Sequence, residues 1–448
     1  MAVTLGSSLW AQTSAPPVEV FFNYPVAGPA PGEVAYTGDA ISAAAVRMVD
    51  EAETSVDLAA YNFDHAPLAS ALRRAHARGV RVRVVTDIDT RHPSLLSPAP
   101  NYFWLAVNDE GLMHHKFLVV DAADPQRAAV MTGSTNFTDA NIYRFYNDAL
   151  LLRSPALATA FTQEFELLWG GAGEAPNARA SRSGSDKPRR ARTRTQVGDL
   201  DVELYFSPND EVSERIAAEI DGATESLAFQ LLVFTYDQIG AAVTRAHDRG
   251  VNVFGVLENY DDPSTEYYYL RGQGVAIEGH EPDEVVHHKY GVIDTERGDA
   301  ATLITGSHNW TYSAETFHDE NTLVVTGSAL LAELYYRAAR DRHCALVGGG
   351  SACFGVVSDL AEPAPAAAEY GVALGPNPTR GALTVTSERP FGAYRVVDAS
   401  GRTVRAALLH ETTERVTLDL HGLPAGAYAL QPRGDAGWWP GRPFQLTK

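Results

Sequence analysis

Short apolar runs and amphipathic stretches alternate along most of this chain. Val18–Phe22 alternates apolar and polar side chains, and residues 80–87 (VRVRVVTD) are rich in β-branched residues, as is typical of strands. Residues 38–53 carry an Ala, Val and Met stripe at helical spacing, and a helix over residues 67–78 is predicted to end at Gly79. Strands that alternate with helices in this way predict an α/β fold whose sheet is rich in parallel strands.

The pattern occurs twice. The first half closes with an amphipathic helix over Pro155–Trp169, and the order of elements then starts again at Asp199 and runs to about Arg342. Such an internal repeat predicts two pseudo-symmetric halves packed together in a monomer. Two stretches of the first half return almost unchanged in the second: VEVFF (18–22) as VELYF (202–206), and AHARGVRV (75–82) as AHDRGVNV (246–253).

Each half also contains a polar motif of the form His-x-Lys-x4-Asp, followed by Gly-Ser-x-Asn. In the first half the residues that define it are His114, Lys116, Asp121, Ser134 and Asn136. Each has a counterpart in the second half at one and the same sequence offset, the repeat offset, and these counterparts are His287, Lys289, Asp294, Ser307 and Asn309.

The apolar residues that follow His114 indicate a buried strand, in which side chains two apart point to the same face. His114 and Lys116 would therefore share a face, while His115 points away. An imidazole beside an ammonium suits attack on a phosphate, because the first supplies a nucleophile and the second neutralises phosphate oxygens. A lone histidine on a strand is more often a core residue, but two identical sets at one offset argue for one composite site.

With these residues the chain resembles the phospholipase D superfamily, whose signature is a duplicated H-x-K-x4-D motif with a trailing G-S-x-N. The resemblance extends over about residues 18–342. It implies two phospholipase D-like α/β/α halves and a metal-independent phosphodiesterase that forms a covalent phosphohistidine. No cofactor is expected, because the lysines supply the positive charge that a metal would otherwise bring.

The resemblance also implies a role for each motif residue. His114 is expected to be the nucleophile, and His287 the general acid that releases the alcohol. The lysines and asparagines are expected to hold the phosphate oxygens, namely Lys116, Lys289, Asn136 and Asn309. The remaining motif residues are expected to be strand-end anchors (Asp121 and Asp294) or residues of the turn and phosphate loop (Ser134 and Ser307).

A carboxylate is expected behind each histidine, where it would bind the second ring nitrogen and fix the tautomer. Glu320 fits in the second half, and Asp148 is its expected equivalent in the first half. The two spacings are unequal, because Asp148 lies one position further beyond Asn136 than Glu320 lies beyond Asn309.

Charge bears on the substrate. The formal net charge is −20, from 56 Asp and Glu against 36 Lys and Arg. A cationic surface normally supplies the affinity for nucleic acid, so this composition favours a phospholipid or another small phosphodiester. An endonuclease that cleaves nucleic acid with the same site is the alternative, and a surface-displayed binding protein with a vestigial site is a third. No apolar run is long enough to span a bilayer.

Segments outside the predicted repeats (18–170 and 199–358) have their own character. Residues 1–17 look like the end of a truncated secretory signal, although no Lys or Arg precedes the apolar run, and a disordered terminus is the alternative. Residues 171–198 hold several basic residues among Gly, Ser and Pro, which predicts a disordered connector, with a tether for anionic lipid or nucleic acid as the alternative. Cys344 and Cys353 are the only cysteines, and in an exported protein they would form a small disulfide loop.

After an Ala/Pro-rich linker (359–369), short β runs separated by Gly, Pro and Asn turns predict a small all-β sandwich over residues 370–448. Its order of short motifs resembles the C-terminal sorting domain of the type IX secretion system: Pro376-Asn377-Pro378 with Gly381, then Asp398 with Gly401, then LPAGAY at 423–428. The resemblance implies recognition by the secretion machinery, and a secreted or cell-surface location in a Gram-negative bacterium. An accessory binding sandwich is the alternative.

Overall fold

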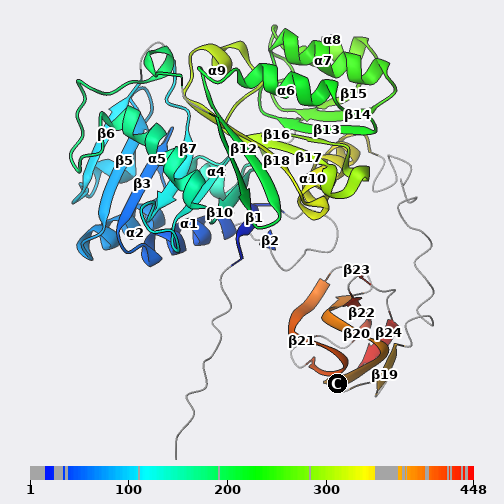
Figure 1. The fold of residues 1–448 in the computed structure, drawn as a ribbon. Helices are drawn as coiled ribbons and strands as arrows, with labels where there is room; N and C mark the ends of the chain where they lie inside the picture. Colours follow the sequence, from blue (N-terminus) through cyan, green and yellow to red (C-terminus); the bar gives the residue numbers. More distant parts are fainter. Residues whose placement is uncertain are drawn as a thin grey trace, which may run out of the picture.

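The structure is a computed structural model in which two α/β halves lie side by side, with a smaller strand-rich C-terminal module (Figure 1). In the two halves it describes residues 16–24, 34–35, 39–108, 111–189, 192–281 and 284–348. In the module it describes residues 372–375, 379, 381–398, 403–420, 423, 426–434, 437–438 and 442–447. Cys344 is not a free thiol, and its expected partner Cys353 lies outside the described residues, as does most of the predicted signal.

The first half is built on an eight-stranded sheet of order β2-β1-β10-β8-β7-β3-β5-β6. The neighbours β3, β5 and β6 run parallel, whereas β7, β8, β10 and β1 pair antiparallel, so the sheet is mixed rather than rich in parallel strands. The prediction was wrong on this point because β7 returns through a short loop directly into β8, and such short connections join antiparallel neighbours. The strands are β1 (Val18–Phe22), β2 (Val34–Ala35), β3 (Ser55–Ala60), β5 (Arg81–Asp87), β6 (Phe103–Val107), β7 (Lys116–Val120), β8 (Ala129–Gly133) and β10 (Asp148–Leu152), with β4 (Phe63–Asp64) and β9 (Phe137–Thr138) forming a small separate sheet.

The second half repeats the arrangement. Its eight-stranded sheet has the order β11-β12-β18-β17-β16-β13-β14-β15, in which β16 takes the place of β7 and β18 the place of β10. The strands are β11 (Thr193–Val197), β12 (Leu200–Ser207), β13 (Ser226–Leu231), β14 (Asn252–Leu257), β15 (Ala276–Gly279), β16 (Lys289–Ile293), β17 (Thr302–Gly306) and β18 (Glu320–Thr326).

The two faces of each sheet pack into different cores. Along β7, Phe117 and Val119 point into a core shared by both halves, and Leu118 and Val120 point into a core of the first half alone. Helices α5 and α10 contribute to the shared core, α1 and α2 cover the other face of the first sheet, and α6 and α7 that of the second. The helices are α1 (Ala40–Glu51), α2 (Ala66–Ala77), α3 (Pro93–Leu96), α4 (Asp139–Tyr143), α5 (Pro155–Trp169), α6 (Val212–Asp221), α7 (Asp237–Asp248), α8 (Glu266–Gly272), α9 (Tyr312–Thr316) and α10 (Ala329–Leu346).

Local sequence signals define the two helices of the shared core. The Ser154 hydroxyl accepts a hydrogen bond from the third amide of α5, and the Ser328 hydroxyl does the same for α10. Helix α5 also has a proline at its first position and ends at Gly170, whose φ of 83° is the left-handed conformation that glycine adopts without strain. No helix in the described part of the chain is long and apolar enough to cross a membrane.

The basic connector between the halves differs from its prediction, because its described residues are ordered. Lys187 is buried, and its Nζ forms an ion pair with Asp319 at 2.6 Å, a second ion pair with Glu164 and a hydrogen bond to the Ser207 carbonyl at 3.0 Å. Glu164 also binds Nε2 of His115 at 2.9 Å. Composition suggested a solvated segment, but one lysine of the connector is neutralised by a carboxylate from each half.

Replacing Lys187 by Met should destabilise the protein strongly. The carboxylates of Glu164 and Asp319 would then remain buried without their cation, which typically costs about 3–5 kcal/mol of unfolding free energy. The midpoint of thermal unfolding measures the loss. Arg189→Met is the matched control, because Arg189 lies in the same connector but is exposed and forms its ion pair with Glu211 at the surface, so the midpoint of this variant should not change. Equal midpoints for both variants would show that the buried cluster does not contribute to stability.

The C-terminal module has a core of its own. Antiparallel pairings join its six strands around buried side chains that include Leu383, Phe391, Leu418 and Leu430. The strands are β19 (Ala373–Gly375), β20 (Ala382–Asp398), β21 (Thr403–Asp419), β22 (Gly426–Gly434), β23 (Gly437–Trp438) and β24 (Arg442–Leu446).

Candidate active site

Two short backbone contacts between the halves position the motif histidines. Each histidine lies two residues before the motif strand, β7 or β16, where the chain passes the other half. Met113 forms an isolated parallel bridge with Asp319, and Val286 forms the equivalent bridge with Tyr146. The residues that follow these bridges therefore meet across the interface, His114 with Glu320 and His287 with Asn147.

The two histidines are oriented by different chemical groups. Nδ1 of His114 lies 2.7 Å from Oε1 of Glu320, and both side chains are buried. Nδ1 of His287 lies 2.9 Å from Oδ1 of Asn147. The Asn147 amide group donates to the Asn141 carbonyl at 2.9 Å, which turns its oxygen toward the histidine. Each Nδ1 therefore donates, and each Nε2 is left as the reactive nitrogen.

This arrangement corrects the prediction for Asp148. Its carboxylate binds Nδ1 of His288, at 2.7 Å, and not a motif histidine, whereas Asn147 occupies the orienting position. The expectation of a carboxylate behind each histidine directed attention to the nearest acid. The constant repeat offset was the better signal, because it pairs Glu320 with Asn147.

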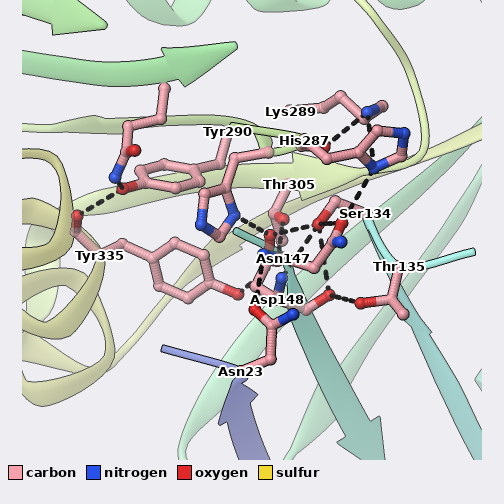
Figure 2. Close-up of polar contacts among 12 residues, drawn as sticks. Asn23, Ser134, Thr135, Asn147, Asp148, His287, Lys289, Tyr290, Thr305 and Tyr335 are labelled. Atoms are coloured by element: carbon pink, nitrogen blue, oxygen red, sulfur yellow. Dashed lines mark hydrogen bonds and ion pairs between the residues drawn. The ribbon is translucent and has the colours of Figure 1, made fainter. Parts of the chain in front are cut away.

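Asp148 instead organises a buried network directly behind the site (Figure 2). Besides the His288 ring, its carboxylate accepts hydrogen bonds from the hydroxyls of Ser134 at 2.9 Å, Tyr335 at 2.8 Å and Thr305 at 3.0 Å. Burial alone would raise the pKa of Asp148, but the contact with His288 and these hydroxyl groups outweighs burial and lowers it. An ionised Asp148 thus ties strands of both sheets together.

The motif lysines are held in the same way in both halves. Nζ of Lys116 donates to the His114 carbonyl at 2.6 Å, and Nζ of Lys289 donates to the His287 carbonyl at 2.6 Å. Both side chains are buried. Burial lowers the pKa of Lys116 to about 7, and burial together with the Lys116 charge places the pKa of Lys289 well below its ordinary value.

The same forces act on the two imidazoles. Burial is the largest cause of a pKa well below 6.5 for both His114 and His287, and the charges of Lys116 and Lys289 add to it. Without a substrate the site therefore disfavours positive charge on these four groups. A phosphodiester anion would reverse this tendency, because it supplies the missing counter-charge.

The asparagines and serines of the Gly-Ser-x-Asn segments occupy different places. Nδ2 of Asn136 lies 3.5 Å from Nε2 of His287 across the interface, and the buried Oδ1 atoms of Asn136 and Asn309 have no hydrogen-bond partner among the residues that the structure describes. Ser134 and Ser307 lie behind the site, where each hydroxyl accepts a hydrogen bond from a backbone amide, that of Asp148 or of Asn321. These two amides belong to the residues that directly follow the orienting positions. Asn136 therefore faces the site, and the serines hold the orienting segments.

The motif aspartates Asp121 and Asp294 lie at the opposite ends of β7 and β16, away from the histidines. The Asp121 carboxylate accepts hydrogen bonds from the amides of residues 53–55, and the Asp294 carboxylate accepts those of residues 224–226. Both residues have positive φ, 49° and 53°, so each carboxylate fastens a tight turn at the end of a motif strand.

Three further aromatic side chains line the histidines, and the sequence reasoning missed them. The Tyr61 ring lies 4.6 Å from the His114 ring, edge to face, and Nζ of Lys116 lies 5.3 Å from its centre. His318 also lies beside His114, and Phe145 lies beside His287. Phe145 and His318 are again related by the repeat offset, so this offset could have found the pair.

The geometry combines two oriented imidazoles, two buried ammonium groups and the amide side chain of Asn136 around one position between the halves. In the described part of the chain, no group of three or more His, Cys, Asp or Glu side chains has the arrangement of a metal site. The arrangement can attack a phosphate ester with one imidazole, protonate its leaving alcohol with the other, and bind its oxygens with the lysines and asparagines.

Comparison with known proteins agrees with this chemistry. The two similar halves and the paired half-sites define a phosphodiesterase of the phospholipase D class. Residues 45–169 and 216–341, together more than half of the chain, match the sequence model of the family described as cardiolipin synthase, PLD-like domain. The chain belongs to this family and carries one copy of its domain in each half. Residues 374–437 match the secretion system C-terminal sorting domain.

Individual relatives cover parts of the chain. Mitochondrial cardiolipin hydrolase from Xenopus tropicalis is 36% identical over 122 residues, which are 26% of this chain and 56% of that protein. The human protein of the same name is 33% identical over 140 residues, 30% of this chain and 52% of that protein. The chain thus spans little more than half the length of these relatives. The crystal structure of phosphatidylserine synthase from Haemophilus influenzae has a similar fold, with a TM-score of 0.52, 12% identity and coverage of 72% of this chain and 85% of that one.

Proposed function

We propose that this chain hydrolyses the phosphodiester bond of phospholipids through a phosphohistidine formed on His114. The hydrogen bond between Glu320 and Nδ1 of His114 is the observation that carries the proposal. A carboxylate at this position keeps the proton on Nδ1, leaves the Nε2 lone pair free, and stabilises the positive charge that the ring gains when it attacks phosphorus. Asn147 orients His287 but offers no negative charge, so the first histidine is the better nucleophile.

His287 then acts as the general acid. Nε2 of His114 forms a bond to phosphorus while the bond to the leaving alcohol breaks, and the protonated Nε2 of His287 gives its proton to the departing oxygen. Lys116, Lys289 and the two asparagines stabilise the charge on the phosphate oxygens. In the second step His287 takes a proton from water, the water oxygen attacks phosphorus, and the bond to His114 breaks to release a phosphate monoester. An amide behind His287 suits this role, because it fixes the ring without making the imidazolium a weaker acid.

A lipid substrate is supported by two observations of different kinds. The curated relatives that the chain matches are named cardiolipin hydrolases, and the net charge of −20 disfavours a long polyanion as the substrate. Purified protein should therefore release the head group from vesicles of cardiolipin or phosphatidylcholine faster than it cleaves single-stranded DNA, with EDTA present throughout. Faster cleavage of DNA would assign the same site to a nuclease, and dependence on added Mg²⁺ or Zn²⁺ for a soluble diester would contradict the proposed chemistry.

The C-terminal module is proposed to direct export across the envelope of a Gram-negative bacterium and not to take part in catalysis. Its match to a secretion system sorting domain and its separate core support this assignment. Truncation after residue 359 should leave diester hydrolysis unchanged in the purified protein and retain the protein inside the native host. A truncated protein with the native unfolding midpoint but little activity would instead show that the module helps to bind the substrate.

A further inference from the structure

A third imidazole lies on the nucleophile's side of the site. The ring of His318 lies 6.1 Å from the ring of His114, tilted by 54°, and its side chain is 19% exposed. Its Nδ1 lies 4.0 Å from Oε1 of Glu320, the atom that orients His114. His318 is thus within about 1 Å of hydrogen-bond distance from the carboxylate that activates the nucleophile.

The polar atoms around this contact are not satisfied. Nδ1 of His318 and Oε2 of Glu320 are both buried, and neither atom has a hydrogen-bond partner within the described part of the chain. A buried donor and a buried acceptor without partners are costly, so a nearby arrangement that joins them is favoured once something stabilises it. In that arrangement Glu320 would bind an imidazole with each oxygen, and Nε2 of His318 would be the nitrogen left to donate to a ligand.

The pseudo-symmetric position carries a side chain of different chemistry. Phe145 is the counterpart of His318 at the repeat offset, and its ring lies 6.3 Å from that of His287, tilted by 34°. The two motif histidines therefore have chemically different neighbours, because a titratable imidazole lies beside the nucleophile and an apolar ring lies beside the general acid. This difference indicates that the two sides of the scissile phosphate are recognised differently.

The charges that face His318 explain when it would become a cation. Burial lowers its pKa, Glu320 raises it, and the nearby His308 and Lys116 lower it. His308 in turn lies 3.6 Å from Oε2 of Glu315. In the free site these influences together lower the pKa of His318, whereas a bound anion would add the negative charge that the imidazolium needs.

We propose that His318 is a further anion-binding residue, which donates from Nε2 to the phosphoryl group on the nucleophile's side while Glu320 holds its Nδ1. The inference deepens the proposed function and rests on it, because it assigns this imidazole to the part of the diester that remains on His114 after the alcohol leaves. The leaving alcohol, on the side of His287, would instead lie against the Phe145 ring.

Sulfate is the probe that tests this assignment, because its charge does not change between pH 6 and pH 8 and its binding does not require turnover. Isothermal titration of the wild-type protein should show tighter sulfate binding at pH 6 than at pH 8. His318→Phe, which copies the side chain of the first half, should weaken sulfate binding at pH 6 about tenfold, and much less at pH 8. His318→Gln keeps a hydrogen-bond donor that carries no charge. It should therefore bind sulfate more tightly than His318→Phe does, but without the part of the pH dependence that is due to His318.

The outcomes separate this inference from the proposed function. A His318→Phe protein with the wild-type unfolding midpoint, sulfate affinity and pH dependence would overturn the role of His318, whatever the enzyme hydrolyses. The expected effect on sulfate combined with cleavage of DNA rather than lipid would overturn the substrate and leave the anion site standing. Proton NMR adds a direct reading, because sulfate should raise the pH at which the His318 ring titrates.

Discussion

His114→Asn should lose turnover of every diester, activated or not, because the atom that forms the bond to phosphorus is gone. His287→Asn should behave differently, because it retains the nucleophile and lacks only the general acid, whose contribution is typically ~10²–10⁴ in rate. A p-nitrophenyl diester, whose leaving group needs no proton, should therefore recover much of the activity of His287→Asn and none of that of His114→Asn. Rates for both variants on the activated and the natural ester measure the contrast.

Quenching in alkaline denaturant, in which the N–P bond of phosphohistidine is stable, locates the intermediate in the same experiment. Protein from the His287→Asn variant should carry phosphate on the peptide that contains residues 113–116, because release by activated water is slowed while attack by His114 is retained. If the quenched wild-type protein instead carried phosphate on the peptide that contains His287, the assignment of the two histidines would be reversed. A complete lack of phosphoenzyme under conditions of steady turnover would point to direct attack by water.

Glu320→Gln should reduce the rate of diester hydrolysis by ~10²–10⁴, although the side chain never touches the substrate. The amide can still accept from Nδ1 of His114, but it no longer stabilises the positive ring and can turn to present its NH₂ group, which favours the wrong tautomer. The loss should fall on kcat and leave KM almost unchanged, since the phosphate ligands remain. A raised KM with normal kcat would show that Glu320 serves binding and not the nucleophile.

Asn147→Asp is the matched control at the pseudo-symmetric position. A carboxylate behind His287 stabilises its imidazolium, so the pKa of His287 should rise. Because the general acid must be protonated when the alcohol leaves, activity should persist to higher pH than in the wild-type enzyme. The basic limb of the pH–rate profile should therefore shift to higher pH for Asn147→Asp. An unchanged limb would mean that His287 does not supply the proton.

The sequence predicted most strongly what depends on local pattern and repetition. The strand after His114, the helix Pro155–Trp169 and the second copy of each motif can be recognised because they repeat with fixed spacing. The orienting residue of His287 could not be predicted from its chemistry, because an acid is expected behind a catalytic histidine and Asn147 is an amide that only the repeat offset identifies. Lys187 shows a different limit, because its burial depends on two carboxylates that are distant in the sequence and not on its neighbours in the connector.

Each motif histidine is oriented by a residue of the other half, and this arrangement bears on how such a chain can evolve. In a dimer of two identical subunits, one gene position would supply the partner of both histidines, so an acid could not be exchanged for an amide at one site alone. Covalent fusion of the two copies removes that constraint, because Glu320 and Asn147 are then encoded separately. A homodimer could not show this difference between its two half-sites. A chain split between residues 170 and 199 would give two polypeptides that must associate before either motif histidine can form its orienting hydrogen bond.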